Sequence, residues 1–478
     1  MRPGALWYHI EPDKEGLSIQ MRLVDPPPRA TFFLPGSWAG NEFDKIFSLE
    51  QARSPDGALA MSINREQGRI DIDTDGADWI ELAYRIDTRS KRTEESRFYP
   101  WRDERAFFAY APTILILPSA GITDQLRDIP IEVHVPGEWT LAATWPRERR
   151  EVDAEARKMS GFIADDVRSL RDAFIAGSKD WRRLEGSLPG GALMLTLTDE
   201  FAFDDDRLLE AATVITRRYL SQFGGYDEIS GIVLPLPDDA PDTLRGTGRH
   251  GGFVLEIPKD HRFDDALLLL LAHEVLHIWN GHQLVPRAAY RDEAQWFKEG
   301  VTHYLALKTL AQLGLVDEQT IRDELATAGR LYLHSPLVTG GHIRSIDRLR
   351  FPYDQGLLIA LSLDLKLLRE TNGAIGIEDW ISTLLSAPFE ERGQAYDGDV
   401  LRESFAHLTA EFGDDLLRKY RSLVESNDQI DVAKLFRSAG LHFLQTDYNN
   451  RSRLLPIDEK TAPFDALFSS PAPSSEMQ

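Results

Sequence analysis

The stretch of this chain best suited to chemistry is LAHEVLHIWNGHQL, residues 271–284. It holds two histidines four positions apart, His273 and His277, with Glu274 directly after the first. On a helix this spacing places both imidazoles on one face, one turn apart, where they can hold a single metal ion. Glu274 then projects beside them and can reach a water on the ion without being a ligand. The alternative interpretation is a polar stripe on a solvated helix.

The surroundings of the motif favour the metal interpretation. Leu269, Leu270, Leu276 and Ile278 would bury the helix, and a buried His or Glu needs a partner. Chance alone gives roughly 0.02 such motifs in a chain of this length and histidine content. The chain has no cysteine, so disulfides, thiolate metal sites and a cysteine nucleophile are excluded. Any metal must be held by His, Asp or Glu.

A third ligand candidate lies further along the chain. Catalytic zinc sites use three protein ligands, and two histidines with one glutamate are a standard set. We predict a turn at Asn280-Gly281 and a second helix from near Asp292, which carries Glu299. A helix–loop–helix of this span can bring the Glu299 carboxylate back to the first helix. The alternative is a surface glutamate, which the apolar neighbours in AQWFKEGV disfavour.

Residues 1–150 read as strands that would form an N-terminal β-sandwich domain. Apolar residues alternate with polar ones from Leu17 to Leu23 and from Ile80 to Ile86, and again at Val133 and Val135. Proline and glycine interrupt these segments, as expected of turns. The charged stretch RSKRTEESR, residues 89–97, is interpreted as a solvated loop.

The pattern changes near residue 151, where we place a second domain that ends at 315. GSLPGG at 186–191 is interpreted as a boundary, and apolar strands are predicted at 192–198, 231–237 and 251–257. A helix opens at Asp204–Asp206, and the His273 helix opens at its predicted N-cap, Asp264. This alternation predicts an α/β domain. Residues 316–460 are predicted to be a C-terminal α-helical domain and 461–478 a disordered tail.

Charge and hydropathy limit the possible partners. The net charge of −23 argues against a nucleic-acid partner or an anionic membrane surface, because both need a basic surface. No apolar run approaches the roughly 18 residues of a membrane span, so no membrane insertion is expected. MRPGALWYHI lacks the apolar core of a signal peptide, which is compatible with a cytoplasmic protein or with export after removal of a signal.

HEVLHIWN followed by WFKEGVTHY resembles the glycyl aminopeptidase family of gluzincin zinc metallopeptidases. That family's signature is a His-Glu-x-x-His-x-Trp-Asn helix followed by a Glu-Gly-x-Thr helix. Looser matches are FFLPGSWAG at 32–40, YDQGLLIALSLDLKL at 353–367, with Gln355 where lysine is usual, and VAKLFRSAGLHF at 432–443. The resemblance implies a multidomain α+β protein with a thermolysin-like catalytic domain. The family's frequent C-terminal PDZ domain is not expected, since only about 35 residues follow the last match.

The resemblance also implies residue roles. His273, His277 and Glu299 would bind one Zn²⁺ per chain, and Glu274 would be the general base. Tyr353 would donate a hydrogen bond to the oxyanion of the tetrahedral intermediate. Trp279, Asn280 and Thr302 also match family positions and would shape the site.

One strand departs from the family pattern. The family has a Gly-Gly-Leu-Glu-His strand that lines the substrate cleft, and its glutamate would bind the substrate's free amine. Here GGFVLEI has Val254 at that position, so Gly251, Gly252 and Glu256 are the candidate substrate-binding residues. Glu256 lies on the same strand face as Val254 and is the candidate replacement for the glutamate.

Taken together, these residues predict a zinc metallopeptidase that acts on peptides, as an aminopeptidase. Two alternatives stay open: a zinc hydrolase of a non-peptide substrate, and a non-catalytic binding protein that kept the fold. The presence of Glu274 disfavours the second, because a scaffold needs no base. His250, His282 and His303 are interpreted as hydrogen-bonded polar residues and are left out of the ligand set.

Overall fold

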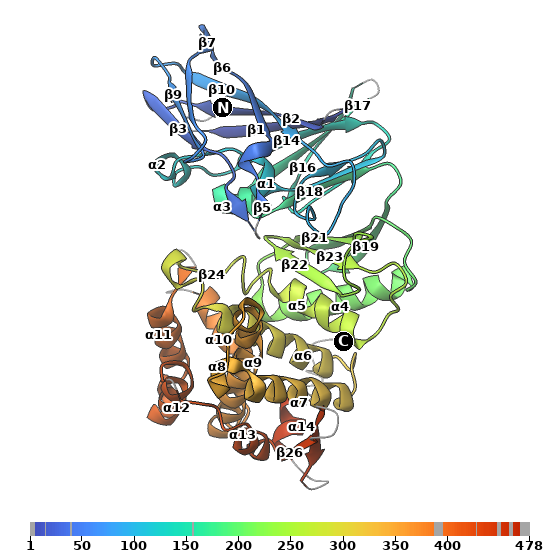
Figure 1. Cartoon of the computed structure of the whole chain (residues 1–478), viewed down its shortest axis with the longest axis vertical. Helices are drawn as coiled ribbons and strands as arrows, with labels where there is room; N and C mark the ends of the chain where they lie inside the picture. The colour runs from blue at the N-terminus through green and yellow to red at the C-terminus, as the bar shows by residue number, and fades with distance from the viewer. Residues whose placement is uncertain are drawn as a thin grey trace.

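The computed structural model describes residues 5–468, apart from 15, 39–40, 155–156, 387–394, 427, 447–450 and 458–461. The chain runs along the long axis of an elongated molecule (Figure 1). A β-rich part lies at one end, helices fill the other, and a smaller mixed sheet lies between them. The architecture is therefore a mixed α+β fold with several sheets and a helical C-terminal region.

The β-rich part holds three larger sheets that share one hydrophobic core. The first has eight strands, in the order β16 (Arg147–Ala154), β17 (Arg157–Ala164), β14 (Ile129–Pro136), β1 (Leu6–Asp13), β2 (Gly16–Val24), β10 (Trp79–Asp87), β6 (Phe47–Ser54) and β7 (Gly57–Leu59). The second is β11 (Trp101–Arg102), β12 (Ala106–Tyr110), β18 (Phe174–Ser178) and β15 (Thr140–Ala143). The third is β13 (Leu117–Pro118), β3 (Arg29–Phe33), β9 (Arg69–Asp73) and β8 (Met61–Asn64).

Period-two burial explains why these segments are strands. In β1, Leu6, Tyr8 and Ile10 are buried while the alternate residues Trp7 and His9 are only half-buried. The strands predicted around Leu17–Leu23, Ile80–Ile86 and Val133–Val135 are confirmed as β2, β10 and β14. Each puts its apolar face on the shared core.

The strands of this part continue beyond residue 150, where we predicted the first domain to end. β17 pairs antiparallel with β14, and β18 pairs with β12. GSLPGG is not a boundary either, because its residues belong to β19 (Arg182–Leu188), β20 (Gly191–Leu197) and the turn that joins them. A glycine- and proline-rich turn looks the same in sequence whether it joins two domains or two paired strands.

The middle sheet has five strands, in the order β19, β20, β21 (Glu228–Pro235), β23 (Gly252–Ile257) and β22 (Arg245–Arg249). β20, β21 and β23 are parallel, and the two edge strands run antiparallel to them. α4 (Asp205–Phe223) and α5 (Asp265–Leu276) pack on one face of this sheet. Asp264 caps α5 as predicted, because its side chain accepts a hydrogen bond from the backbone N–H of Leu267.

The helical part follows the turn after α5. Its helices are η3 (Trp296–Val301, a π-helix), α6 (Thr302–Gln312), α7 (Glu318–His334), α8 (Pro336–Thr339), α9 (Ser345–Glu370), α10 (Ile377–Leu385), α11 (Gly398–Leu408), α12 (Asp414–Val424), α13 (Val432–Ser438) and α14 (Ala462–Phe468). A hairpin of β26 (Leu441–Thr446) and β27 (Arg451–Pro456) packs against α7 and α13. Lys308 on α6 forms ion pairs of 2.7 Å with Asp364 on α9 and 2.8 Å with Glu378 on α10, which joins three helices in the interior.

The prediction of a disordered tail from residue 461 is wrong for residues 462–468. They form α14, whose Phe464, Leu467 and Phe468 are buried against the helical part. Residues 469–478 lie outside the described residues. Within the described residues, no helix is both long and apolar enough to cross a membrane.

Candidate metal centre

Three side chains converge at the end of α5. The Nε2 atoms of His273 and His277 lie 2.9 Å apart, and Glu299 Oε2 lies 3.4 Å from the first and 3.1 Å from the second. Ligands about 2.1 Å from a tetrahedral zinc stand roughly 3.4 Å from one another, so these three atoms have suitable spacing. All three residues are buried. The structure thus brings together the three residues predicted as ligands.

The hydrogen bonding of His277 leaves its Nε2 atom free to bind a metal ion. Its Nδ1 lies 2.8 Å from the carbonyl oxygen of Asn280, to which the neutral ring donates. The lone pair of Nε2 therefore points at the Glu299 carboxylate and at the other imidazole. Such a cluster of lone pairs needs a cation at its centre. A protonated His277 would supply that charge in place of the cation: burial raises the pKa of Glu299, but the charge of His277 and hydrogen bonds from both histidines would bring it well below its ordinary value.

Asn280 also holds the two ligand-bearing segments together. It is fully buried, and its side-chain N–H groups donate to the carbonyl of Phe297 and the hydroxyl of Thr302, each at 3.0 Å. Trp279 donates from Nε1 to the carbonyl of Gly224, 2.9 Å away at the end of α4. The turn after α5 is thus tied to η3, α6 and α4. The expectation that Trp279, Asn280 and Thr302 shape the site agrees with these contacts.

Glu299 lies on the π-helix η3, just before α6. A π-turn adds a residue to one helical turn and re-aims its side chains, and such turns are frequent at functional sites. Gly300 allows α9 to approach at backbone distance, because a Cβ there would lie 2.7 Å from the carbonyl carbon of Gly356. The same contact brings Tyr353, one turn before Gly356, to the metal centre.

Tyr353 is partly exposed on α9, and its hydroxyl lies near the Glu299 carboxylate. Its ring stacks on that of His273 with 6.1 Å between the centroids. Burial, together with the negative charges of Glu299 and Glu274, raises the pKa of Tyr353 above its ordinary value. The hydroxyl stays protonated and can donate a hydrogen bond beside the metal centre.

Glu274 is buried, and its Oε2 has no hydrogen-bond partner among the described residues. An ionisable oxygen left unpaired in the interior is costly, so it is expected to serve a function. β22, which the sequence analysis did not predict, covers this side chain. A Cβ on Gly246 would lie 2.6 Å from Glu274 Cδ, and a Cβ on Gly248 would lie 3.0 Å from the Glu274 carbonyl oxygen.

Gly246 and Gly248 are therefore functional positions that the sequence analysis missed. Their signal was a Gly-x-Gly pattern at strand spacing, GTG at 246–248. It is weak, because β22 has almost no apolar residue to mark it as a strand. Two glycines on one strand face let the backbone of β22 lie directly against α5.

The predicted substrate-binding role of Glu256 is contradicted by its position. Phe253 and Leu255 of β23 pack with α5, so Glu256, one residue on, faces the opposite side of the sheet. There it forms ion pairs with Arg92 and, at 3.4 Å, with Arg97. Residues 89–97 are therefore not a freely solvated loop, because the Arg92 side chain is mostly covered in its ion pair with Glu256.

Gly251 and Gly252 lie against Thr144 of the β-rich part and, for Gly252, against the neighbouring strand β21. Gly251 has a φ of +68° at the turn into β23, and a Cβ there would lie 2.9 Å from the carbonyl oxygen of Thr144. A Cβ on Gly252 would collide with the backbone of Ser230 on β21. Both glycines allow close packing of strands and of the β-rich part. Their role in substrate binding stays a prediction.

The three other histidines occupy different surroundings. His282 is paired with Asp172, and His250 packs edge to face against Tyr226. His303 lies beside His273, with 5.7 Å between the ring centroids. Burial, followed by the charge of His273, lowers the pKa of His303 to about 3. In the described residues, none of the three belongs to the cluster of possible ligand atoms.

Comparison with known proteins gives one sequence match and several structural ones. Residues 266–346, which include α5, η3 and α6, match the family model of the M61 glycyl aminopeptidases. No curated protein matches the chain by sequence. The match covers the segment that carries all three candidate ligands and Glu274.

The fold is similar to solved metallopeptidase structures. An aminopeptidase N family protein from Idiomarina loihiensis aligns with a TM-score of 0.73 and 18% identity, over 95% of this chain and 80% of that one. An M1 zinc metallopeptidase from Deinococcus radiodurans aligns with a TM-score of 0.58 and 14% identity, over 90% of this chain and 95% of that one. A mutant of the latter, solved with a Tyr-Ser-Ala substrate, aligns equally well. At these identities the similarity establishes the fold.

Proposed function

We propose that the chain is a metallopeptidase that hydrolyses peptide bonds with one zinc ion held by His273, His277 and Glu299. Its residues 266–346 match the family model of the M61 glycyl aminopeptidases. The observation that carries this proposal is the triangle of His273, His277 and Glu299 atoms, 2.9 to 3.4 Å apart. Beside it lies the buried Glu274, whose Oε2 has no hydrogen-bond partner among the described residues. Two histidines and a glutamate are sufficient to bind a catalytic zinc ion, so the site needs no thiolate ligand.

The chain's own residues account for the proton movements. When bound, zinc lowers the pKa of a water toward about 7 and polarises the substrate carbonyl. Glu274 is the base that accepts a proton from the attacking water and passes it to the leaving amine. The hydroxyl of Tyr353 donates a hydrogen bond to the oxyanion that develops on the former carbonyl. Gly246 and Gly248 leave space for Glu274 and His277 beneath the edge strand.

The finer part of the proposal is that the enzyme is an aminopeptidase. Its support is the match to a glycyl aminopeptidase family. An aminopeptidase must pair the charged amine of its substrate with a carboxylate, because burying an unpaired ammonium is costly. Glu256 does not supply that carboxylate, and the charged residues of β22, Arg245 and Arg249, are cationic. The amine partner must therefore come from another element.

Digestion of a peptide library tests the proposal. We expect cleavage by the zinc-loaded protein, loss of cleavage on chelation and recovery when zinc is restored. Glu274→Gln should keep its zinc and its thermal stability while kcat falls by orders of magnitude, since the amide cannot accept the proton. Comparable turnover by Glu274→Gln would remove the mechanism. Cleavage of a non-peptide ester or amide but of no peptide would favour a different zinc hydrolase.

A matched pair of substrates tests the aminopeptidase part separately. Peptides with a free N-terminus should be cleaved much faster than the same peptides after N-acetylation. Equal rates would show that no amine site exists and that the enzyme is an endopeptidase, while the metal mechanism would stand.

A further inference from the structure

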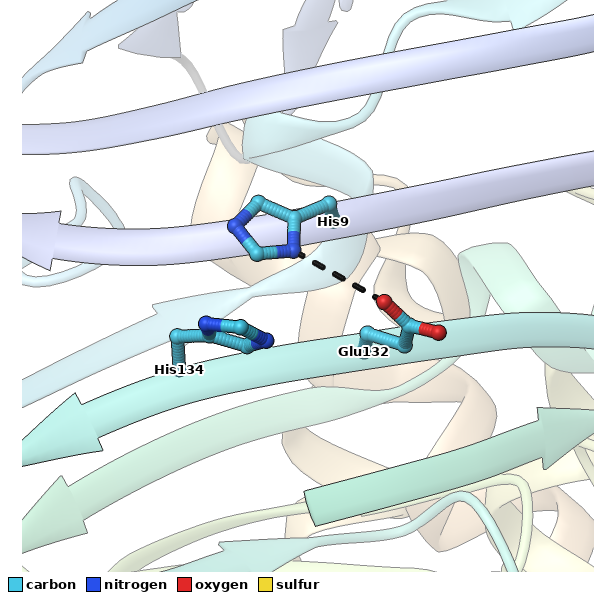
Figure 2. A group of neighbouring side chains, drawn as sticks. All are labelled: His9, Glu132 and His134. Atoms are coloured by element: carbon cyan, nitrogen blue, oxygen red, sulfur yellow. Dashed lines mark ion pairs between the residues drawn. The ribbon is translucent and has the colours of Figure 1, made fainter. Parts of the chain in front are cut away.

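A second group of metal-binding side chains lies in the β-rich part, away from α5. Within the described part of the chain, two groups place three possible ligand atoms within 4.8 Å of one another. One is the His273, His277 and Glu299 cluster, and the other is His9, Glu132 and His134. The second group comes from two neighbouring strands, and its side chains face one another from them (Figure 2).

Strand pairing explains why these residues meet. β1 and β14 are parallel neighbours, and their register places His9 directly opposite Glu132. His134 lies two residues after Glu132 and so points to the same side of the sheet. This side is half-buried, whereas Tyr8, Ile10, Ile131 and Val133 point to the core. The group therefore lies on the outer face of the eight-stranded sheet.

Ordinary cross-strand pairing does not account for the contacts. The rings of His9 and His134 stand edge to face with 4.3 Å between their centroids. His9 Nδ1 lies 3.9 Å from the Glu132 carboxylate, which is beyond hydrogen-bond distance. His134 Nε2 is buried and has no hydrogen-bond partner among the described residues. Two imidazoles and a carboxylate thus gather around one point without bonding to one another.

The surroundings of His9 favour its role as a ligand. The second nitrogen of its ring, Nε2, lies 3.9 Å from the carboxylate of Glu11. A carboxylate behind a ligand histidine orients the ring and strengthens its basicity, as is usual in metal sites.

We propose that His9, Glu132 and His134 form a second divalent transition-metal site, of the zinc class, which links β1 to β14. Two histidines and a glutamate are a donor set that zinc accepts. The ligand atoms must approach to roughly 3.4 Å from one another, a movement of about 1 Å that half-buried side chains can make. The ion crosslinks residues far apart in the sequence, a task that a disulfide cannot perform in a chain without cysteine.

Zinc uptake by the full chain tests this site independently of catalysis. The double variant His273→Ala/His277→Ala removes the catalytic ligands, and chelated protein is then equilibrated with micromolar free zinc. We expect the double variant to take up one zinc per chain, and its thermal unfolding midpoint to rise when zinc is added. Adding His134→Gln should weaken zinc binding at least tenfold and abolish the rise. Gln20→Ala, at the residue opposite His9 on β2, is the matched control and should change neither.

Two results would overturn the proposal. One is that the double variant binds no zinc under these conditions. The other is that His134→Gln and the isosteric Glu132→Gln both bind zinc as tightly as their parent does. Glu132→Gln keeps the test valid if His134→Gln proves unstable when free of metal. Peptidase activity of the otherwise unaltered chain should be unchanged by His134→Gln, which separates failure of this site from failure of the catalytic centre.

Discussion

The close approach of β22 to Glu274 makes Gly246→Ala a sharp test of how the general base is positioned. A Cβ on Gly246 would lie 2.6 Å from Cδ and 2.7 Å from Oε1 of Glu274, whereas ordinary contacts between heavy atoms are about 3.5–4.0 Å. The carboxylate, or the strand above it, must move by roughly 1 Å. Glu274 is buried between α5 and the edge strand, so its side chain has little room to adjust elsewhere.

A misplacement of about 1 Å at a reacting group costs on the order of 100-fold in rate. At 1.36 kcal/mol for each factor of ten, this corresponds to about 2.7 kcal/mol of lost transition-state stabilisation. Zinc content should not change, because Glu274 is not one of the three converging ligands. The assay is kcat/KM on a fluorogenic peptide that the unaltered enzyme cleaves, with zinc content measured on the same sample.

Gly121→Ala is the matched control, because a Cβ there meets no atom within 4 Å. It should leave kcat/KM unchanged. A folded, zinc-loaded Gly246→Ala enzyme with unaltered kcat/KM would refute the reasoning, since it would show that the position of Glu274 beneath β22 does not limit the reaction.

Three further predictions concern Glu299, Tyr353 and Glu256. Glu299→Ala should lose the catalytic zinc, measured with His134→Gln present so that the second site does not contribute; full retention would mean that the third ligand is another residue, with His303 the next candidate. Tyr353→Phe should lower kcat by about 10²–10³-fold, with KM and zinc content nearly unchanged, because one oxyanion donor is lost; an unaltered kcat would exclude the proposed hydrogen bond. Glu256→Gln should lower the free energy of unfolding, measured in denaturant, by roughly 3 kcal/mol, because the mostly covered Arg92 side chain loses its anionic partner. A changed preference for free N-termini with unaltered stability would instead support a role of Glu256 in substrate binding.

The residues of the metal centre could be predicted because helices make neighbours of residues close in sequence. His273 and His277 share a face through the 3.6-residue period, and Asp264 is recognisable as a cap from its type and place. The prediction of Glu299 as a ligand depended only on a short turn that brings the chain back to the first helix. Asn280 stabilises that turn through hydrogen bonds to the second segment. Family resemblance added Tyr353, which α9 brings to the centre from a distance that no local pattern indicates.

Strand pairing decided what the sequence alone could not. A strand's pattern reveals which residues share a face, but not which face lies against the catalytic helix. The sequence pattern therefore predicts Glu256 at the substrate, whereas the pairing of β23 with β22 and β21 turns it toward Arg92. Likewise, His9 and Glu132 have no sequence relationship, and only the register of β1 on β14 makes them neighbours. Helical spacing is a local property of the chain, whereas sheet register depends on which distant segments complete the core.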